Sequence, residues 1–258
     1  MKHHARLLLL ACSLGLAGCA EDVKLQPAKP LAASAEQLAA IPGLEPGEHR
    51  VLKGEAMDWR LGERSLRLRT VEPEGAGPFP LVIFSHGFAS DIDKYDALFA
   101  HWASHGYLVI APYHPDGGGT LRGIFNSLRM GNQGLIAARV ADLRLILDHL
   151  GELDSVSPGL AQRIDRSRIA AAGHSFGAFT AQQMGGAAAI DPDSGVRIEG
   201  RDRRVRAVLA ISPPGRMFGL INEKSWLDLD VPMLATTGTW DVDGRFVHDW
   251  HEHTQSWH

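Results

Sequence analysis

A serine lies at the centre of the most chemically informative stretch of the chain, Gly173–Gly177, which reads Gly-His-Ser-Phe-Gly. The stretch follows a short apolar segment, residues 169–172, and precedes residues that can begin a helix. A G-x-S-x-G turn between strand and helix holds its serine on a sharp bend. There the hydroxyl projects from the sheet and the helix N-terminus directs positive charge toward it. The pattern predicts that Ser175 is a nucleophile.

The glycines of this stretch support the prediction, because the alternative is an ordinary turn with a solvent-facing serine. A Cβ at position 173 or 177 would crowd such a bend, and glycine tolerates the unusual dihedral angles found there. The motif alone is weak, so the strand and the helix on either side of it have to be present for the interpretation to hold.

A serine nucleophile needs a base, a carboxylate that orients the base, and N–H donors for the oxyanion of the tetrahedral intermediate. The backbone N–H of Phe176, the residue after the serine, is the expected first donor. For the second donor we predict the N–H of Phe88, in the loop after the apolar segment 81–84. Gly87 would let that loop approach the nucleophile closely.

The predicted acid is Asp241, which follows the last apolar segment, residues 231–237. Asp243 is a nearby competitor, and either residue could instead begin the following helix. The other candidate position, after residues 205–211, offers Ser-Pro-Pro-Gly and no carboxylate.

The base is harder to place. Where the serine lies on a G-x-S-x-G turn between strand and helix, the histidine follows the acid in the chain, after a helix and a further strand. No apolar run that could form such a strand follows Asp241, and residues 246–257 resemble the intervening helix. We therefore expect the catalytic histidine to lie beyond residue 258, and this chain alone to retain little activity. The histidines near the motifs or in the tail are His86, His174, His248, His251, His253 and His258; we expect the first two to pack rather than catalyse.

Apolar segments alternate with helical patterns along the chain. Residues 65–71 alternate apolar and polar side chains, which predicts a half-buried antiparallel strand. Other segments are apolar on both faces, as strands of a covered parallel sheet are. The predicted buried strands are 81–84, 107–111, 169–172, 205–211 and 231–237; the predicted helices are 94–105 and 135–150; residues 191–204 are predicted to be a surface loop. The pattern predicts an α/β fold with a mostly parallel sheet, whose chemistry gathers at the carboxyl ends of its strands.

Several motifs together resemble a known group of α/β-hydrolases. They are residues 79–88 (Phe-Pro-Leu-Val-Ile-Phe-Ser-His-Gly-Phe), 104–107 (Ser-His-Gly-Tyr), the turn at 173–177, and 237–241 (Thr-Gly-Thr-Trp-Asp). They look like the predicted dienelactone hydrolases, which are similar in turn to platelet-activating-factor acetylhydrolases and lidless polyester hydrolases. The resemblance covers roughly residues 60 to 245. It implies the α/β-hydrolase fold with its last strand missing here, and ester hydrolysis by a Ser-His-Asp triad. True dienelactone hydrolases use cysteine, so Ser175 favours a general carboxylic ester hydrolase.

The N-terminus differs from the rest of the chain. A basic start and an apolar run, residues 7–16, precede Leu16-Ala17-Gly18-Cys19. This pattern predicts a signal peptide over residues 1–18, and its end resembles a bacterial lipobox in which Cys19 is lipidated. Ala20 resembles the outer-membrane-directed kind, and a soluble periplasmic protein is the alternative. Residues 19–47 are a predicted tether, and 48–258 the hydrolase domain.

Composition narrows the remaining possibilities. The 258 residues carry a formal charge of −4 without basic clusters, which argues against nucleic acid as a partner. Both cysteines, Cys12 and Cys19, lie in the N-terminal segment, so we expect no disulfide and no thiolate metal site. We expect a monomer with no cofactor and no metal, although the histidine-rich tail could bind a transition metal. A hydrolase fold that only binds a ligand is a further alternative.

The substrate is predicted only as a class, a lipid-like, short-chain or polyester-type ester. About 20 residues separate segments 205–211 and 231–237, too few for a large lid, which predicts an open site. The apolar residues that could form its walls are Phe88, Tyr113, Met217, Phe218 and Trp240.

Overall fold

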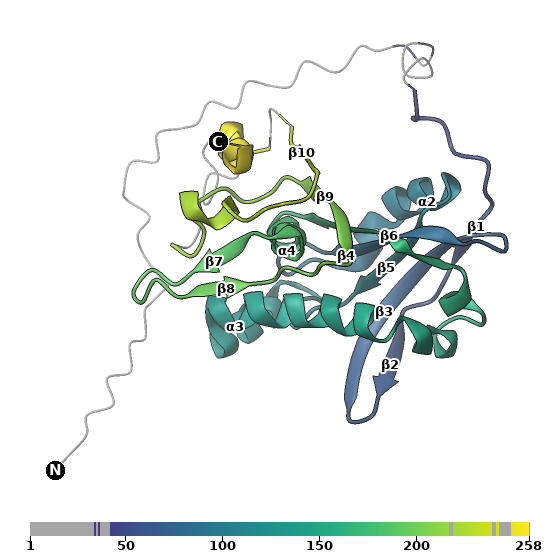
Figure 1. Cartoon of the computed structure of the whole chain (residues 1–258), viewed down its shortest axis with the longest axis horizontal. Coiled ribbons are helices and arrows are strands. Elements are labelled where there is room, and N and C mark those ends of the chain that lie inside the picture. Colours follow the sequence, from purple (N-terminus) through teal and green to yellow (C-terminus); the bar gives the residue numbers. More distant parts are fainter. Residues whose placement is uncertain are drawn as a thin grey trace.

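The apolar segments of the chain pair with one another in a single eight-stranded sheet in the computed structural model (Figure 1). Its order is β1-β3-β5-β4-β6-β9-β10, and β2 also pairs with β3. The bounds are β1 Val51–Lys53, β2 Met57–Leu61, β3 Arg64–Pro73, β4 Phe79–Ser85, β5 Leu108–Pro112, β6 Ile164–His174, β9 Val205–Ile211 and β10 Met233–Thr236. β5, β4, β6, β9 and β10 are parallel, whereas β1, β2 and β3 pair antiparallel. This confirms the predicted α/β class.

The structure describes residues 34, 36, 42–216, 219–238, 241–242 and 249–257. The predicted signal peptide, the lipidation site Cys19 and most of the predicted tether lie outside these residues. Within them, no helix combines the length and the apolar character that crossing a membrane requires.

Side chains on both faces of the central parallel strands β4 and β5 are buried, for the reason that predicted them. β10, at the edge of the sheet, was also predicted to be buried, but its Leu234 is 65% exposed. Leu81 and Ile83 of β4 pack in one apolar cluster with Leu143. The alternate side chains of β4 point to the other face, where Phe84 packs in a second cluster with Phe99. Because side chains alternate along a strand, a strand covered on both faces has to be apolar throughout.

Helices cover the two faces of the sheet (Figure 1). α2 (Asp96–Ser104) lies on one face and contributes Phe99 to the second cluster. α3 (Thr120–Asp148) and α4 (Phe176–Gly185) contribute to the first cluster on the opposite face. The predicted apolar stripe at positions 135–150 is buried as expected. Short 3-10 helices are η1 Ile92–Tyr95, η2 Leu150–Ser155, η3 Leu160–Gln162, η4 Glu223–Trp226 and η5 Trp250–Trp257.

Two details differ from the sequence-based expectations. Residues 191–204, predicted to be a loop throughout, contain β8 (Arg197–Glu199), which pairs antiparallel with β7 (Ala188–Ile190). The strand forms because β7 supplies hydrogen-bonding partners and Ile198 packs against the apolar cluster around Leu220. α3 also begins well before the predicted helix and is interrupted at Gly131, whose φ of 68° is non-helical.

Candidate active site

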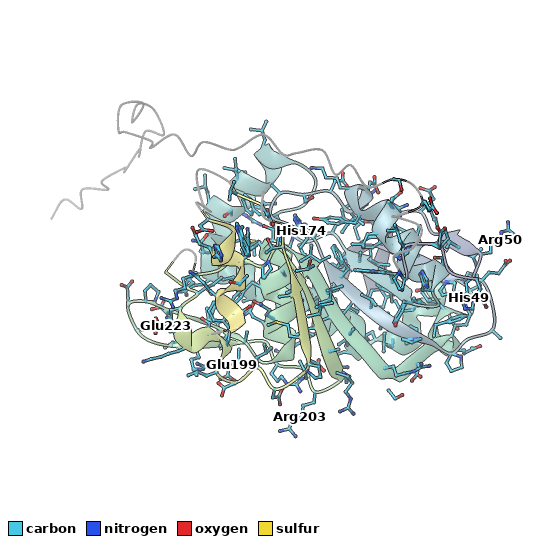
Figure 2. All side chains as sticks on the ribbon, turned by 90° about the horizontal axis from the view of Figure 1, so that it is seen from above. His49, Arg50, His174, Glu199, Arg203 and Glu223 are labelled. Carbon is cyan, nitrogen blue, oxygen red and sulfur yellow. The ribbon has the colours of Figure 1, made fainter. Side chains whose placement is uncertain are left out.

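The predicted site residues follow strands that are neighbours in the sheet. Ser175 comes directly after β6, Gly87 follows the end of β4, and Asp241 follows β10. Because these strands are parallel, their carboxyl ends share one edge of the sheet. His174, the last residue of β6, lies at the opposite end of the sheet from Arg203, which precedes β9 (Figure 2).

The backbone at Ser175 is held in an unusual conformation. Its φ of 53° and ψ of −122° lie outside the regions that a residue with a side chain usually adopts. The strand β6 ends at His174 and α4 begins at Phe176, so the strand and helix expected on either side of the turn are present. The Ser175 N–H donates to the Ile211 carbonyl at 2.9 Å, which ties the bend to β9.

The two glycines of the turn are required by close backbone contacts. A Cβ added at Gly173 would lie 2.1 Å from the Gly177 carbonyl oxygen. A Cβ at Gly177 would lie 2.0 Å from the Ser85 carbonyl oxygen and 2.5 Å from that of His86. The turn therefore packs backbone to backbone on the end of β4, which brings Ser175 to the loop containing Gly87.

The loop after β4 lies against the serine. A Cβ built on Gly87 would be 3.6 Å from the Cβ of Ser175, and the rings of Phe88 and Phe176 meet edge to face at 6.5 Å. Among the described residues, the N–H groups of Phe88 and Phe176 donate to no protein acceptor, and Ser175 Oγ makes no hydrogen bond. Two N–H donors without partners beside a serine are what stabilisation of an oxyanion requires.

The hydroxyl of Tyr95 joins this loop to the turn. It accepts the N–H of Gly87 at 3.1 Å and lies 2.9 Å from Nδ1 of His174. Burial lowers the pKa of His174, and the nearby charge of Asp241 opposes that shift. His174 therefore packs beside the serine as a neutral ring, and the carboxylate of Asp241 is close enough to act on it.

The carboxylate of Asp241 is fixed at the end of β10. Its Oδ2 accepts the Thr237 hydroxyl at 3.0 Å, and its backbone N–H donates to Gly238 at 2.9 Å. The competing acid, Asp243, lies outside the described residues. Asp241 therefore remains the predicted acid at this edge.

Sequence reasoning placed His253 in a helix over residues 246–257; the structure has it in the 3-10 helix η5 and, in addition, beside Asp241. The ring is buried, and its Nε2 lies 3.6 Å from Asp241 Oδ2. Both nitrogens face carbonyl oxygens: Nδ1 faces Pro213 at 2.7 Å, and Nε2 faces Asp241 at 3.0 Å. Neither nitrogen bonds Ser175, so the described residues assign no base to the serine. His248 and His258 lie outside them.

A buried polar cluster lies beneath the loop after β4, and no sequence motif pointed to it. It consists of His86, His114, Asp116, Arg139 and Asp142 with Ser85, and each is buried. Arg139 holds both oxygens of Asp116, at 3.0 and 2.6 Å. Burial, together with the charge of Arg139, lowers the pKa of His86 and of His114 well below the ordinary imidazole value.

Part of this cluster imitates a catalytic triad. Ser85 Oγ lies 2.9 Å from His114 Nε2, and His114 Nδ1 lies 2.9 Å from Asp142 Oδ2. Ser85 is wholly buried, however, and its oxygen also accepts a hydrogen bond from Arg139 at 3.1 Å. No substrate can reach it, so this serine is a structural group.

The buried carboxyl group of Asp142 should make the stability of the folded protein depend on pH. Burial raises the pKa of Asp142 to about 7, above the value of about 4 in an unfolded chain. The folded state then binds its proton more strongly, so this contribution to stability is present at low pH and is lost as pH rises through 7. Asp142→Asn cannot titrate. Relative to wild type, we expect it to gain about 2 to 3 kcal/mol in unfolding free energy between pH 5 and pH 8, measured in urea. A difference independent of pH would contradict this.

The predicted substrate walls are described only in part. Phe88 is 43% exposed beside the serine, and Tyr113 is partly buried with Arg67 over its ring. Met217, Phe218 and Trp240 lie outside the described residues. A pocket of about 320 Å³ lies elsewhere, between α3 and β8, where Val140 and Ile198 line it. Within the described part of the chain, no group of three or more histidine, cysteine or acidic residues could hold a metal ion.

Parts of this sequence are similar to known proteins. A chlorophyllase family model matches residues 63–188. Platelet-activating factor acetylhydrolase from Bos taurus is 30% identical over 139 residues, which cover 41% of this chain and 31% of that protein. Chlorophyllase-1, chloroplastic, from Citrus sinensis is 43% identical over 42 residues, or 16% of this chain and 13% of that one. The chain thus spans less than a third of each of these curated relatives.

A solved structure shows the same architecture over most of the chain. An acylaminoacyl peptidase from Pyrococcus horikoshii superposes with a TM-score of 0.50 at 15% identity, covering 83% of this chain and 35% of that one. The similarity agrees with the mostly parallel sheet and the helices on both of its faces. The chain therefore has the α/β-hydrolase fold.

Proposed function

We propose that this protein is a serine carboxylic ester hydrolase that forms an acyl-enzyme intermediate on Ser175. The observation that carries the proposal is the strained backbone of Ser175, which lies against a loop whose Phe88 N–H has no partner among the described residues. A strained residue persists only where its surroundings over-determine it, and such residues cluster at functional sites. Here the surroundings are the backbone contacts of Gly173 and Gly177.

In this proposal Ser175 Oγ attacks the ester carbonyl carbon, and the carbonyl oxygen becomes an oxyanion. The N–H groups of Phe88 and Phe176 donate to that oxygen. A histidine base takes the serine proton and returns it to the leaving alcohol, and Asp241 orients and stabilises the histidine. Water then hydrolyses the acyl-enzyme by the same steps.

The substrate class is a lipid-like, short-chain or polyester-type ester. The names of two relatives support an acyl ester: one is an acetylhydrolase and the other a chlorophyllase. The partly exposed Phe88 offers an apolar contact beside the serine. The sequence at Cys19 further supports a protein tethered by lipid in the cell envelope, where such esters would be met.

A fluorophosphonate probe tests the proposed nucleophile. The probe forms a bond only with an activated serine, so peptide mass spectrometry should find its mass on the peptide containing Ser175. The peptide containing Ser85 should stay unmodified, because that hydroxyl is buried and hydrogen-bonded to Arg139. The labelled protein should also lose hydrolysis of p-nitrophenyl butyrate.

Two results would count against the proposal. Hydrolysis that persists after full labelling of Ser175 would assign the reaction to another group. Absence of both labelling and hydrolysis, in a form of the protein that includes the histidine predicted beyond residue 258, would favour the binding-only alternative, in which the fold holds a ligand without reacting with it.

A further inference from the structure

Arg139 is a wholly buried cation in the middle of α3. Burying a charge is costly unless it is paired and its hydrogen-bonding groups are satisfied. Arg139 meets both conditions, because its Nε donates to one oxygen of Asp116 at 3.0 Å and Nη2 donates to the other at 2.6 Å. The pairing is bidentate, which fixes the plane of the guanidinium.

The remaining N–H groups of Arg139 hold the end of β4 and the loop after it. Nη1 donates to the His86 carbonyl at 2.6 Å and to Ser85 Oγ at 3.1 Å. Nη2 donates to the Gly87 carbonyl at 3.3 Å. A guanidinium has five N–H donors, and each of these contacts uses one of them. Three N–H groups of Arg139 thus donate to Ser85, His86 and Gly87, the residues that immediately precede Phe88, the predicted oxyanion donor.

The carbonyl of Gly87 is held from several sides. Besides Arg139, it accepts from His86 Nδ1 at 2.7 Å and from the Ser90 N–H at 3.2 Å. The peptide bond between Gly87 and Phe88 is trans, so its N–H points opposite to its carbonyl. With the carbonyl turned toward the buried guanidinium, the N–H of Phe88 is turned away from it.

The carboxylate of Asp116 fixes the other side of Phe88. Its Oδ2 accepts the backbone N–H of Ala89 at 3.4 Å. The guanidinium also lies over the ring of Phe176, 4.8 Å from its centroid. The pair formed by Arg139 and Asp116 therefore contacts the chain immediately before and after Phe88, and the residue that carries the other predicted donor.

We propose that Arg139 is a positioning residue: it orients the Gly87–Phe88 peptide so that the Phe88 N–H is preorganised for the oxyanion. The proposal rests on the proposed ester hydrolysis for its catalytic consequence, but the orientation of the peptide is a property of the protein alone. A preorganised donor acts where charge develops, so its loss should lower kcat and leave KM nearly unchanged.

A double variant, Asp116→Asn with Arg139→Met, tests the role without leaving an unpaired buried charge. We expect kcat for p-nitrophenyl butyrate to fall about 10²- to 10³-fold, as when an oxyanion donor is removed, with KM within about threefold. The matched control is Asp202→Asn with Arg204→Met. It removes a bidentate pair of the same type, with contacts of 2.9 and 2.6 Å, at the start of β9. The control should keep kcat within about twofold of wild type.

Arg139→Lys separates position from charge and serves if the double variant does not fold. Lysine keeps the positive charge beside Asp116 but lacks the fork that reaches two carbonyls as well. We expect kcat to stay well below wild type, by at least tenfold. A kcat restored to the wild-type value would show that charge alone suffices and would overturn the positioning role.

A crystal structure of either variant gives a readout that needs no activity. We expect the Gly87–Phe88 peptide to have rotated away from its wild-type orientation. An unchanged peptide, or a folded double variant with kcat within about threefold of wild type, would overturn the proposal for Arg139. If the wild-type protein hydrolyses no ester even with the histidine predicted beyond residue 258 included, the proposed function fails; the orientation of the peptide in the variants then decides the role of Arg139 by itself.

Discussion

Replacing Ser175 by alanine should abolish ester hydrolysis while the fold is preserved. The variant loses the only atom that attacks the carbonyl in the proposed mechanism, and removal of such a nucleophile costs on the order of 10⁴- to 10⁶-fold in kcat. The hydroxyl makes no hydrogen bond with the described residues, so its loss leaves none of their polar groups without a partner. Steady-state kinetics with p-nitrophenyl butyrate and a thermal melt measure the two effects separately.

Ser212→Ala is the matched control. Ser212 follows β9 at the same edge of the sheet and has a similarly unusual φ of 49°, against 53° for Ser175. The change therefore removes a hydroxyl from the same kind of backbone position, and kcat should stay within a few-fold of wild type. Equal losses in the two variants would mean that the edge of the sheet, and not Ser175 itself, is being disturbed.

Gly177→Ala should cause a large loss of stability although it adds only one methyl group. The new Cβ would meet two backbone carbonyl oxygens, at 2.0 and 2.5 Å, and neither can rotate away as a side chain could. Either α4 or the end of β4 has to move. We expect a cost of about 3 kcal/mol or more in unfolding free energy, measured by urea denaturation. Esterase activity should fall too, because the displaced backbone carries either Ser175 or the loop of Gly87.

Gly134→Ala provides the comparison for this change. Gly134 lies in α3, where an added Cβ would find only Met130 at an ordinary 3.5 Å. Alanine favours helix over glycine by about 1 kcal/mol, so this variant should be as stable as wild type or slightly more stable. If Gly177→Ala unfolds at the same urea concentration as Gly134→Ala, the backbone of the turn is not packed as tightly as described here.

The sequence was most informative where a single physical requirement determined the residue types. Strands covered on both faces have to be apolar throughout, and this requirement located β4 and β5 to within a few residues. The apolar runs of β9 and β10 were located as well, although those strands are covered less completely. The turn around Ser175 was recognisable because only glycine fits the two positions where backbones touch. Local requirements of this kind can be recognised in the amino-acid sequence.

The buried cluster around Arg139 could not be recognised in the sequence in this way. Arg139 and Asp142 fall among apolar residues of α3, where single charged residues usually indicate a solvated helix face. The partners of Arg139 are Ser85 and Asp116, which lie 54 and 23 positions away in the sequence. Only the packing of α3 under the end of β4 brings these groups together. The same holds for His253, whose approach to Asp241 depends on how the tail folds back and not on any spacing.

The hydroxyl of Tyr95 has one proton, and its neighbours determine where that proton goes. The oxygen accepts the N–H of Gly87, and donating its own hydrogen to Nδ1 of His174 would place the proton of a neutral ring on Nε2. In the other tautomer Nδ1 donates to the same oxygen, which has a second lone pair for it. The tautomer of this histidine is thus coupled to the direction in which the Tyr95 hydroxyl points, and that hydroxyl bridges two loops that follow different strands.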